Sequence, residues 1–496
     1  MNISKSKYCD FRVCPKNMWL KQHKPELTET GLDAQSRTEA GKEIGNMAKG
    51  LFGDYSDVTI TNPDGSPVFS AMLSRTQELL AKGTSVICEA SFSINGLFCS
   101  VDILRKTDEG WAIYEVKSGS NPDIETYKVD VAFQKYVLDT AGITVSSCYL
   151  VTVNSQYVFD GTMDISQFFT ITDMSEAIKE EYDMIATLLP RAHATLESSI
   201  EPDIDLFDSC QGCDFWGYCS RSLPSPSVFD LYRMAFKEKL KFYRKGLVSY
   251  EDLLSSGEVT NPIRIMQLMH QLNDRPDQID APKITEFLNT LSYPLYFLDF
   301  ETMQPAIPRY VGTHPYQQVP FQYSLHYIEG EGMPLKHKEF LAESGVDPRR
   351  GLAEQLCTDI PQNVCTLAYN KQFECCRIKE LAEAFSDLSA HLLNIRDNIV
   401  DLLVPFQSGY YYNRAMGGSF SIKSVLPALF PNDSELDYHK LEGVHNGSEA
   451  MNVFPKLEFM SPEEQAETRH NLLKYCELDT YAMVKVWEKL RDMIKQ

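Results

Sequence analysis

The chain has 496 residues, which is enough for roughly two to four domains with sizeable cores. Hydrophobic residues make up 43% and charged residues 23%, as in an ordinary soluble globular protein, and no apolar run approaches the roughly 18 residues of a membrane span. The formal net charge of −22 excludes a protein that coats nucleic acid nonspecifically, because such binding needs many Lys and Arg contacts to phosphates.

The N-terminal segment MNISKSKYCD lacks the apolar stretch of a signal peptide, so we expect a cytoplasmic protein without membrane association. Residues 1–30 contain Cys14, in the context VCPKNMWL, and a short helix. A helix is predicted over residues 36–52 (SRTEAGKEIGNMAKGLF).

Three strands are predicted between Glu89 and Ser120, because apolar and polar residues alternate and the pattern breaks at Asn95-Gly96 and at residues 108–110. Asp102 lies on the middle strand, and Glu115 and Lys117 lie on the third. Residues two apart on a strand point to the same face. Carboxylates that converge there favour a divalent cation, with Lys117 beside the reacting group. The alternative is an exposed sheet face with scattered charges.

A helix over 126–140 follows, with Gln134 on it, and then a strand, CYLVTV. The order α-β-β-β-α-β with D…E-x-K resembles the RecB-like branch of the PD-(D/E)XK nucleases. The resemblance implies that Asp102 and Glu115 bind Mg²⁺ or Mn²⁺, that Lys117 is catalytic, and that Gln134 corresponds to the glutamine of the next helix. Many relatives carry a metal-binding histidine on the first helix. This helix has none, so Glu43 is its candidate substitute, and Glu89 is a further candidate acid.

Three cysteines follow in the segment DSCQGCDFWGYCSRS, spaced C-x2-C-x5-C: Cys210, Cys213 and Cys219. Disulfides are not expected in the cytoplasm, and thiolates this close need a metal or a cluster. Cys14 is the best candidate for the fourth ligand. RecB-type nucleases with an iron–sulfur clasp, including the CRISPR adaptation nuclease, place one cysteine before the core and three after it. This resemblance favours a [4Fe–4S] cluster, with Zn²⁺ as the alternative.

The segment SLPSPS (222–227) is typical of a linker, and residues 228–290 show a helical, partly basic pattern. A second group of polar residues starts on an apolar strand, PLYFLDFET, on which Asp299 and Glu301 share a face. VPFQYSLHYIEG predicts the next strand. CTLAYNKQFE predicts a strand that runs into a helix, with Glu374 at the junction. A long late helix carries Tyr475 and Asp479, four residues apart on one face.

These elements resemble the DEDD exonucleases, the DnaQ-like branch of the RNase H-like fold. The resemblance implies that Asp299, Glu301, Glu374 and Asp479 hold two metal ions and that Tyr475 orients the attacking water. Glu374 stands where those enzymes usually have aspartate, and Asp401 is a possible stand-in.

Together the two halves resemble a bacterial domain-of-unknown-function family that joins the two nuclease types. The resemblance includes GGSFSIKSVLPALFP (417–431), in which Ser421-Ile422-Lys423 opens a helix that we interpret as a packing feature. We therefore expect an α/β protein with a RecB-like domain and its iron–sulfur clasp over 1–225, a helical connector over 226–290, and an RNase H-like domain over 291–496.

The expected function is metal-dependent hydrolysis of DNA, at single strands or ends, in repair or mobile-element defence. Exonuclease action is favoured over endonuclease action. One alternative is an RNA exonuclease, and another is a nucleic-acid-binding or scaffold protein with one degenerate site.

Overall fold

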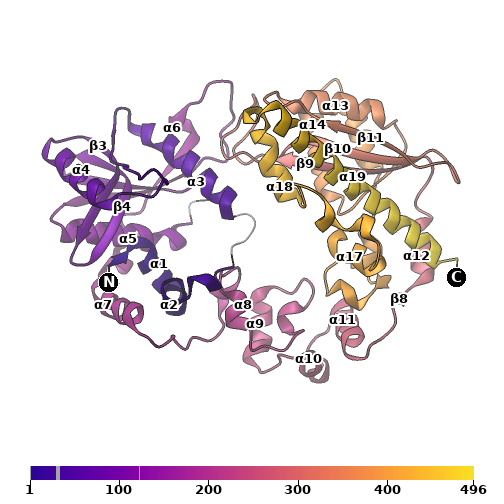
Figure 1. Cartoon of the computed structure of the whole chain (residues 1–496), viewed down its shortest axis with the longest axis horizontal. Coiled ribbons are helices and arrows are strands. Elements are labelled where there is room, and N and C mark those ends of the chain that lie inside the picture. The colour runs from indigo at the N-terminus through magenta and orange to yellow at the C-terminus, as the bar shows by residue number, and fades with distance from the viewer. Residues whose placement is uncertain (1, 30–33, 122, 496) are drawn as a thin grey trace. The chain divides into compact units, whose positions relative to one another are not determined.

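The computed structural model describes residues 2–29, 34–121 and 123–495, and these form two compact units (Figure 1). The first unit is Met1–Arg221 with Pro305–Gln317, and the second is Ser222–Gln304 with Gln318–Gln496. Both units combine helices with a sheet, so the expected α/β class is confirmed. In the described part of the chain, no helix is long and apolar enough to cross a membrane.

The strands of the first unit are β1 (Ile3–Ser4), β2 (Ser56–Asp57), β3 (Val86–Ile94), β4 (Leu97–Thr107), β5 (Gly110–Val116), β6 (Val145–Val153) and β7 (Phe169–Asp173). Its helices are α1 (Lys5–Val13), α2 (Pro15–His23), α3 (Ala34–Ala48), α4 (Phe69–Ala81), α5 (Ile124–Thr140), α6 (Ile165–Phe168), α7 (Lys179–Glu197) and α8 (Trp216–Ser220).

These strands form one sheet in the order β2-β3-β4-β5-β6-β7, with β1 pairing β4 in parallel. The predicted α-β-β-β-α-β order is confirmed by α3, β3, β4, β5, α5 and β6, although α4, which no prediction covered, lies between α3 and β3. Asn95 and Gly96 both have positive φ, 50° and 77°, as the tight turn between β3 and β4 requires.

The sheet of the first unit separates two apolar cores. On β3 and on β4, the set of residues that faces each core changes at an acidic residue. Cys88 and Ile103 pack in the core that contains α3. Ala90 and Val101 pack in the other core, with α1, α4, α5 and α7. The changeover on β3 falls at Glu89, whose φ is 57°. The changeover on β4 falls at Asp102, so at each acid the alternation of residues between the two cores shifts by one position.

Pro305–Gln317 belongs to the first unit, although the sequence placed it in the second domain. Ala306, Ile307 and Tyr316 contribute apolar surface to the core that contains α3. The amide of Phe159 donates to the carbonyl of Thr313 (3.0 Å), and the amide of Gly312 donates back to the carbonyl of Phe159 (2.8 Å). Apolar burial and main-chain pairing thus hold this segment on the first unit.

The strands of the second unit are β8 (Gln278–Ile279), β9 (Leu295–Met303), β10 (Val319–Ile328), β11 (Lys336–Leu341), β12 (Cys365–Ala368), β13 (Ile399–Asp401) and β14 (Tyr411–Tyr412). Its helices are α9 (Phe236–Arg244), α10 (Tyr250–Ser256), α11 (Pro262–Leu272), α12 (Ala281–Leu288), α13 (Pro348–Asp359), α14 (Gln372–Ala384), α15 (Ser389–Asp397), α16 (Val404–Gln407), α17 (Ile422–Leu429), α18 (Gly447–Val453) and α19 (Pro462–Met493).

Five strands of the second unit form a sheet in the order β11-β10-β9-β12-β13, with β9 antiparallel to β10 and parallel to β12. Tyr296, Leu298 and Phe300 of β9 face a core made with α13, α14 and α15. The alternate face, which carries Asp299 and Glu301, therefore turns the other way, and α19 packs against β9 and β10. The segment 226–290, expected to be a connector, is helical over α9–α12 and belongs to this unit.

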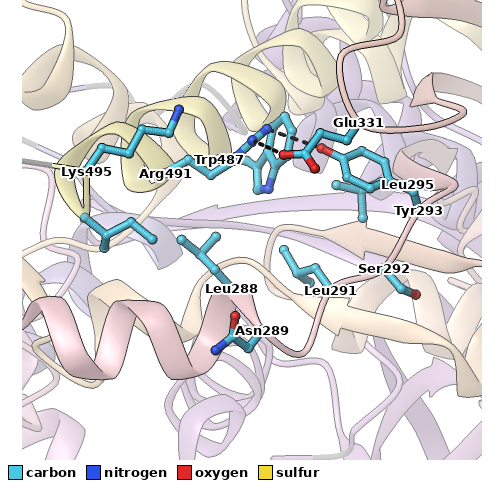
Figure 2. Close-up of a pocket in the computed structure, with 11 residues that line it drawn as sticks. Leu288, Asn289, Leu291, Ser292, Tyr293, Leu295, Glu331, Trp487, Arg491 and Lys495 are labelled. Carbon is cyan, nitrogen blue, oxygen red and sulfur yellow. Dashed lines mark hydrogen bonds and ion pairs between the residues drawn. The ribbon is translucent and has the colours of Figure 1, made fainter.

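A surface pocket of the second unit lies between the end of α12, the start of β9 and the last turns of α19 (Figure 2). Arg491 lines it, and its guanidinium donates to the hydroxyl of Tyr293 (3.2 Å) and to the carboxylate of Glu331 (3.3 Å). This cation is already partnered, and the acids of the predicted sites do not line the pocket. We therefore place the functional groups elsewhere.

Candidate metal centres and the cysteine clasp

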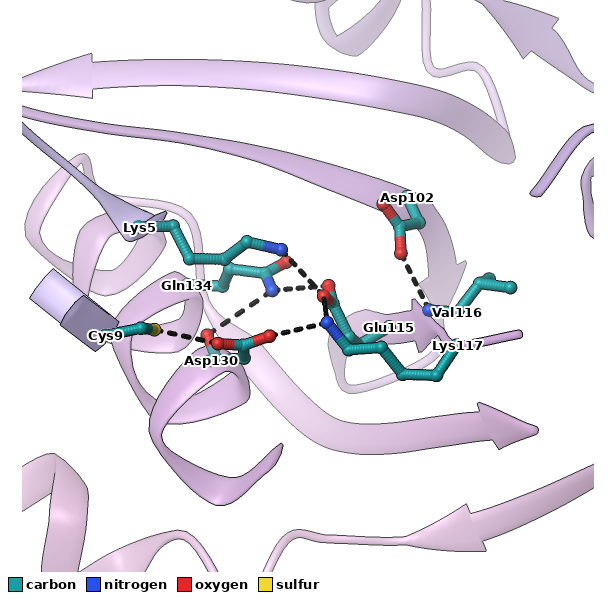
Figure 3. Close-up of polar contacts among 8 residues, drawn as sticks. All are labelled: Lys5, Cys9, Asp102, Glu115, Val116, Lys117, Asp130 and Gln134. Carbon is teal, nitrogen blue, oxygen red and sulfur yellow. Dashed lines mark hydrogen bonds and ion pairs between the residues drawn. The ribbon is translucent and has the colours of Figure 1, made fainter. Parts of the chain in front are cut away.

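In the first unit, the predicted acids meet the predicted lysine and glutamine on one side of the sheet: Asp102, Glu115, Lys117 and Gln134 (Figure 3). Glu115, which is only 1% exposed, accepts hydrogen bonds from Lys5 (2.6 Å), from Gln134 of α5 (2.6 Å) and from Lys117 (2.9 Å). Asp102 accepts from the amide of Val116, 2.7 Å away. The structure thus brings Asp102, Glu115, Lys117 and Gln134 together, as the spacing predicted.

The two carboxylates respond differently to burial. Burial raises the pKa of Asp102, and the charge of Glu115 raises it further. Burial also acts to raise the pKa of Glu115, but Lys5 and Lys117 outweigh it and hold that pKa well below its usual range. Glu115 is therefore a fixed anion at neutral pH, and Asp102 gains most from an added cation.

Lys117 is held between two carboxylates. Its ammonium donates to Asp130 of α5 at 2.6 Å, and the thiol of Cys9 donates to the other oxygen of Asp130 at 2.7 Å. Burial acts to lower the pKa of Lys117, but Glu115 and Asp130 raise it well above its usual range. A charged ammonium that is still 22% exposed can reach a phosphate at the edge of this site.

The two weak candidates of the first unit lie at different depths. Glu89 is half-buried, and burial raises its pKa, with Asp57 and Glu115 adding to the effect and Lys49 opposing it. Glu43 is exposed on α3. Glu89 is therefore the better third acid of this site.

Tyr316 reaches the same region from the segment Pro305–Gln317. Its hydroxyl donates to the carbonyl of Ser118, the residue after Lys117. Burial raises the pKa of Tyr316, and the charge of Glu43 adds to this effect. This contact ties the residue that follows the catalytic lysine candidate to a segment inserted between β9 and β10.

The second unit gathers its acids around β9 and α19. One ligand atom each from Asp299, Glu301 and Cys476 lies within 4.8 Å of the others. Asp479 follows on α19 one turn after Tyr475, and its carboxylate accepts from the hydroxyl of Tyr438 at 2.6 Å. The strand acids thus lie against α19 at Cys476, and the charge of Asp479 on the same helix acts to raise the pKa values of Asp299 and Glu301.

Lys423 is a cation of this second site that the sequence did not indicate. Its ammonium donates to the hydroxyl of Tyr475 (3.4 Å) and lies over the rings of Tyr438 and Tyr475. Its charge acts to lower the pKa values of Asp299 and Asp479. The residues after Ser421 form the packed helix α17, as the packing interpretation expected. That interpretation did not assign Lys423 to the site.

Glu374, in the first turn of α14, is 2% exposed, and one of its oxygens is buried without a hydrogen-bond partner. Burial raises its pKa to about 8, with a further contribution from Asp401. Asp401 itself uses one oxygen to accept from the amides of Asn370 and Leu403, both at 2.9 Å. Asp401 thus anchors two loops, whereas Glu374 keeps one buried oxygen without a hydrogen-bond partner.

Four carboxylates of the second unit act on one another. The pKa of Asp299 is raised well above its usual range, first by burial and then by the charges of Asp479, Glu301 and Glu374. Burial, followed by the charges of Asp479 and Glu374, also raises the pKa of Glu301 well above its usual range, against the effect of Lys423. Burial raises the pKa of Asp479 to about 6. Acids packed this closely, with Lys423 as the cation that offsets them, are suited to hold divalent cations.

The four predicted cysteines also come together, and two of them, Cys213 and Cys219, pack against Trp19, Leu20 and Phe215. Burial raises the pKa values of Cys14, Cys210 and Cys219, and each is raised further by at least one other thiol of the group. The charge of Cys213 acts to raise the pKa values of all three thiols. The sulfur of Cys213 also accepts a weak hydrogen bond from the side-chain amide of Asn17, 3.7 Å away. The four thiols therefore bring the start of α2 next to the chain that follows α7.

Some site residues escaped the sequence analysis. Asp130 lies four residues before Gln134 on one helix face, so that spacing was a usable signal. Lys5 and Tyr438 arrive from distant parts of the chain, and no local pattern marks them. Lys423 lies in the segment 417–431, which the sequence analysis interpreted as a packing feature rather than as part of a site.

Comparison with known proteins finds one family model and a distant relative. Residues 296–421 match the family model described as "Domain of unknown function (DUF2779)". An uncharacterized protein of Mycoplasma genitalium, MG366, is 25% identical over 324 residues, which is 57% of this chain and 47% of that protein. The chain thus spans about half the length of the curated relative that it matches.

Proposed function

We propose that the chain is a metal-dependent nuclease with two sites that hydrolyses phosphodiester bonds of DNA, at single strands or ends, in repair or mobile-element defence. The observation that carries the proposal is the pair of carboxylate clusters, one in each unit, each with a lysine beside it. A divalent cation at such a cluster activates water and stabilises the leaving oxygen.

In the first unit, Asp102 and Glu115 would hold the cation, with Glu89 as a third acid. Gln134 fixes one oxygen of Glu115 and so orients the other. Lys117 stands ready to stabilise negative charge on the phosphate. The confirmed order of elements supports the resemblance to the RecB-like PD-(D/E)XK nucleases.

In the second unit, Asp299, Glu301, Glu374 and Asp479 would hold cations, as in the DEDD exonucleases that this unit resembles. The unpartnered oxygen of buried Glu374 supports its inclusion, because a buried polar atom without a partner is costly. Tyr475 and Lys423 lie beside Asp479 and can orient water and offset charge. Exonuclease action fits the resemblance of this site.

The spacing of the clasp supports a [4Fe–4S] cluster over zinc. Cys14 lies far before the C-x2-C-x5-C run, which is the arrangement of the iron–sulfur RecB-type nucleases that the sequence resembles. Four thiolates can bind the four irons of such a cluster, one each.

Anaerobically purified full-length protein should therefore be brown and contain iron. Cys213→Ser should lower the iron content and the folding yield, because cluster binding is coupled to folding. Cys376→Ser, on α14 of the second unit, is the matched control and should keep the iron. Stoichiometric zinc without iron in the anaerobic wild-type protein would overturn the cluster assignment.

The proposal as a whole is tested by incubating the full-length protein with Mg²⁺ or Mn²⁺ and end-labelled DNA or RNA, single- and double-stranded. Cleavage of DNA that stops with chelator is expected. Preference for RNA would move the substrate to RNA, and binding without cleavage would favour a scaffold with degenerate sites.

A further inference from the structure

A second group of metal-ligating side chains lies in the second unit, apart from the four acids. His326 of β10 and His337 of β11 are directly opposite across the strand pair, with ring centroids 4.5 Å apart. Glu477 of α19 completes the group, and one ligand atom from each of the three lies within 4.8 Å of the others. His326 is buried, whereas His337 and Glu477 are half-buried, so an ion can enter from solvent.

Hydrogen bonds fix which ring nitrogens are bare. The hydroxyl of Thr480 donates to the carbonyl of Glu477 (3.1 Å), since a carbonyl can only accept. Its one proton is then used, so Ser324 (2.6 Å) and Nδ1 of His326 (2.8 Å) must donate to it. Ser324 has in turn used its proton, so Nε2 of His337 donates to Ser324 (2.9 Å). In the neutral rings, this leaves Nε2 of His326 and Nδ1 of His337 with free lone pairs.

We propose that His326, His337 and Glu477 form a binding site for a divalent transition metal, with zinc as the preferred ion. Imidazole nitrogens favour zinc over magnesium. Ligating histidines bind a partner through their other nitrogen, as Ser324 and Thr480 provide here. Two histidines and a glutamate form a known ligand set of zinc, with water in the fourth position.

The carboxylate of Glu477 has the capacity for this role. Lys474 donates to its Oε2 at 2.7 Å, which leaves Oε1 for an ion. A metal here would join β10 and β11 to α19, two residues before Asp479. The site would therefore stabilise the second unit and hold the helix that carries Tyr475 and Asp479. It does not depend on the proposed nuclease function, because its ligands are separate from the four acids.

The test uses full-length protein stripped with chelator, supplied with excess Mg²⁺, titrated with Zn²⁺ and passed through a desalting column. Bound zinc is measured by elemental analysis, and thermal unfolding is followed in parallel. His337→Gln should retain one equivalent of zinc less than the wild-type protein, with affinity lower by roughly a hundredfold or more. Its zinc-dependent rise in Tm should be correspondingly smaller.

His391→Gln is the matched control, because His391 lies on α15 of the same unit and contacts the carbonyl of Ile360. It should bind zinc as the wild-type protein does. Glu477→Gln keeps the shape of the side chain and should also bind one equivalent of zinc less. This second variant keeps the test valid if His337→Gln does not fold. Zinc held by the cysteines is common to all these proteins and cancels in the comparison. Equal zinc in the wild-type protein, His337→Gln and Glu477→Gln would overturn the site, whereas DNA cleavage tests the nuclease separately.

Discussion

Replacing Lys117 with alanine should lower metal-dependent cleavage by the first unit roughly a hundredfold or more, the usual cost of removing a group that stabilises charge in the transition state. The ammonium lies 2.9 Å from Glu115 and 2.6 Å from Asp130, next to the proposed cation ligands. The rate should be measured in single turnover in an Asp299→Asn background, so that the second unit is silent.

The fold should survive this change, because Glu115 keeps its ion pair with Lys5 at 2.6 Å. Lys128→Ala is the matched control. Lys128 lies on α5 of the same unit, where it pairs with Glu125 at 2.8 Å, and its replacement should leave the cleavage rate unchanged. If Lys117→Ala is folded and cuts at the same rate as Lys128→Ala, the first unit is not a nuclease of the proposed kind.

Replacing Asp299 with asparagine should raise the metal-free stability of the second unit and remove most of its stabilisation by Mg²⁺ or Mn²⁺. Burial and the neighbouring acids raise the pKa values of Asp299 and Glu301 well above the usual range, so ionising them costs folding free energy. In the wild-type protein, a cation at 100 times its Kd adds about 2.7 kcal/mol. Thermal unfolding of the full-length protein, with chelator or with metal, measures both effects.

The same carboxylates set the sign of the pH dependence. An acid whose pKa is raised on folding stabilises the protein below its unfolded pKa of about 4, and this contribution is lost as the pH rises through the folded value. Burial raises the pKa of Asp479 to about 6 and that of Glu374 to about 8. The metal-free Tm should therefore fall from about pH 4 to about pH 8, and metal should raise Tm more at pH 8 than at pH 5.

Asp359→Asn is a control that should change the metal-free stability in the opposite direction to Asp299→Asn. Asp359 is a buried acid of the same unit, but it accepts from Tyr323 (2.6 Å) and from Lys338 (2.9 Å). Its replacement should lower the free energy of unfolding by about 1 kcal/mol and leave the metal response intact. A metal-free protein that is unaffected by Asp299→Asn, together with a Tm that does not respond to metal, would leave a binding or scaffold domain as the better account.

Local patterns in the sequence predicted the parts of each site that depend on local spacing. The alternation on β4 and β5 placed Asp102 and Glu115, the helical spacing on α19 placed Tyr475 above Asp479, and Asn95-Gly96 marked a turn. These positions follow from the period of one strand or helix.

Contacts between distant segments could not be predicted in this way. Lys5 reaches Glu115 across 110 residues of chain, and Lys423 reaches Tyr475 across 52. The segment Pro305–Gln317 leaves β9 and packs on the first unit through residues that have no distinctive pattern. Such contacts depend on which surfaces meet in the folded protein, and a single sequence carries no local mark of them.

The most direct test of two nuclease sites is cleavage of end-labelled DNA by the wild-type protein, Lys117→Ala, Asp299→Asn and the double variant, each with Mg²⁺ or Mn²⁺. We predict that each single variant loses one activity and keeps the other, and that the double variant cuts at least roughly a hundredfold more slowly than either. A folded double variant that cuts DNA as fast as the wild-type protein would contradict the assignment of both sites.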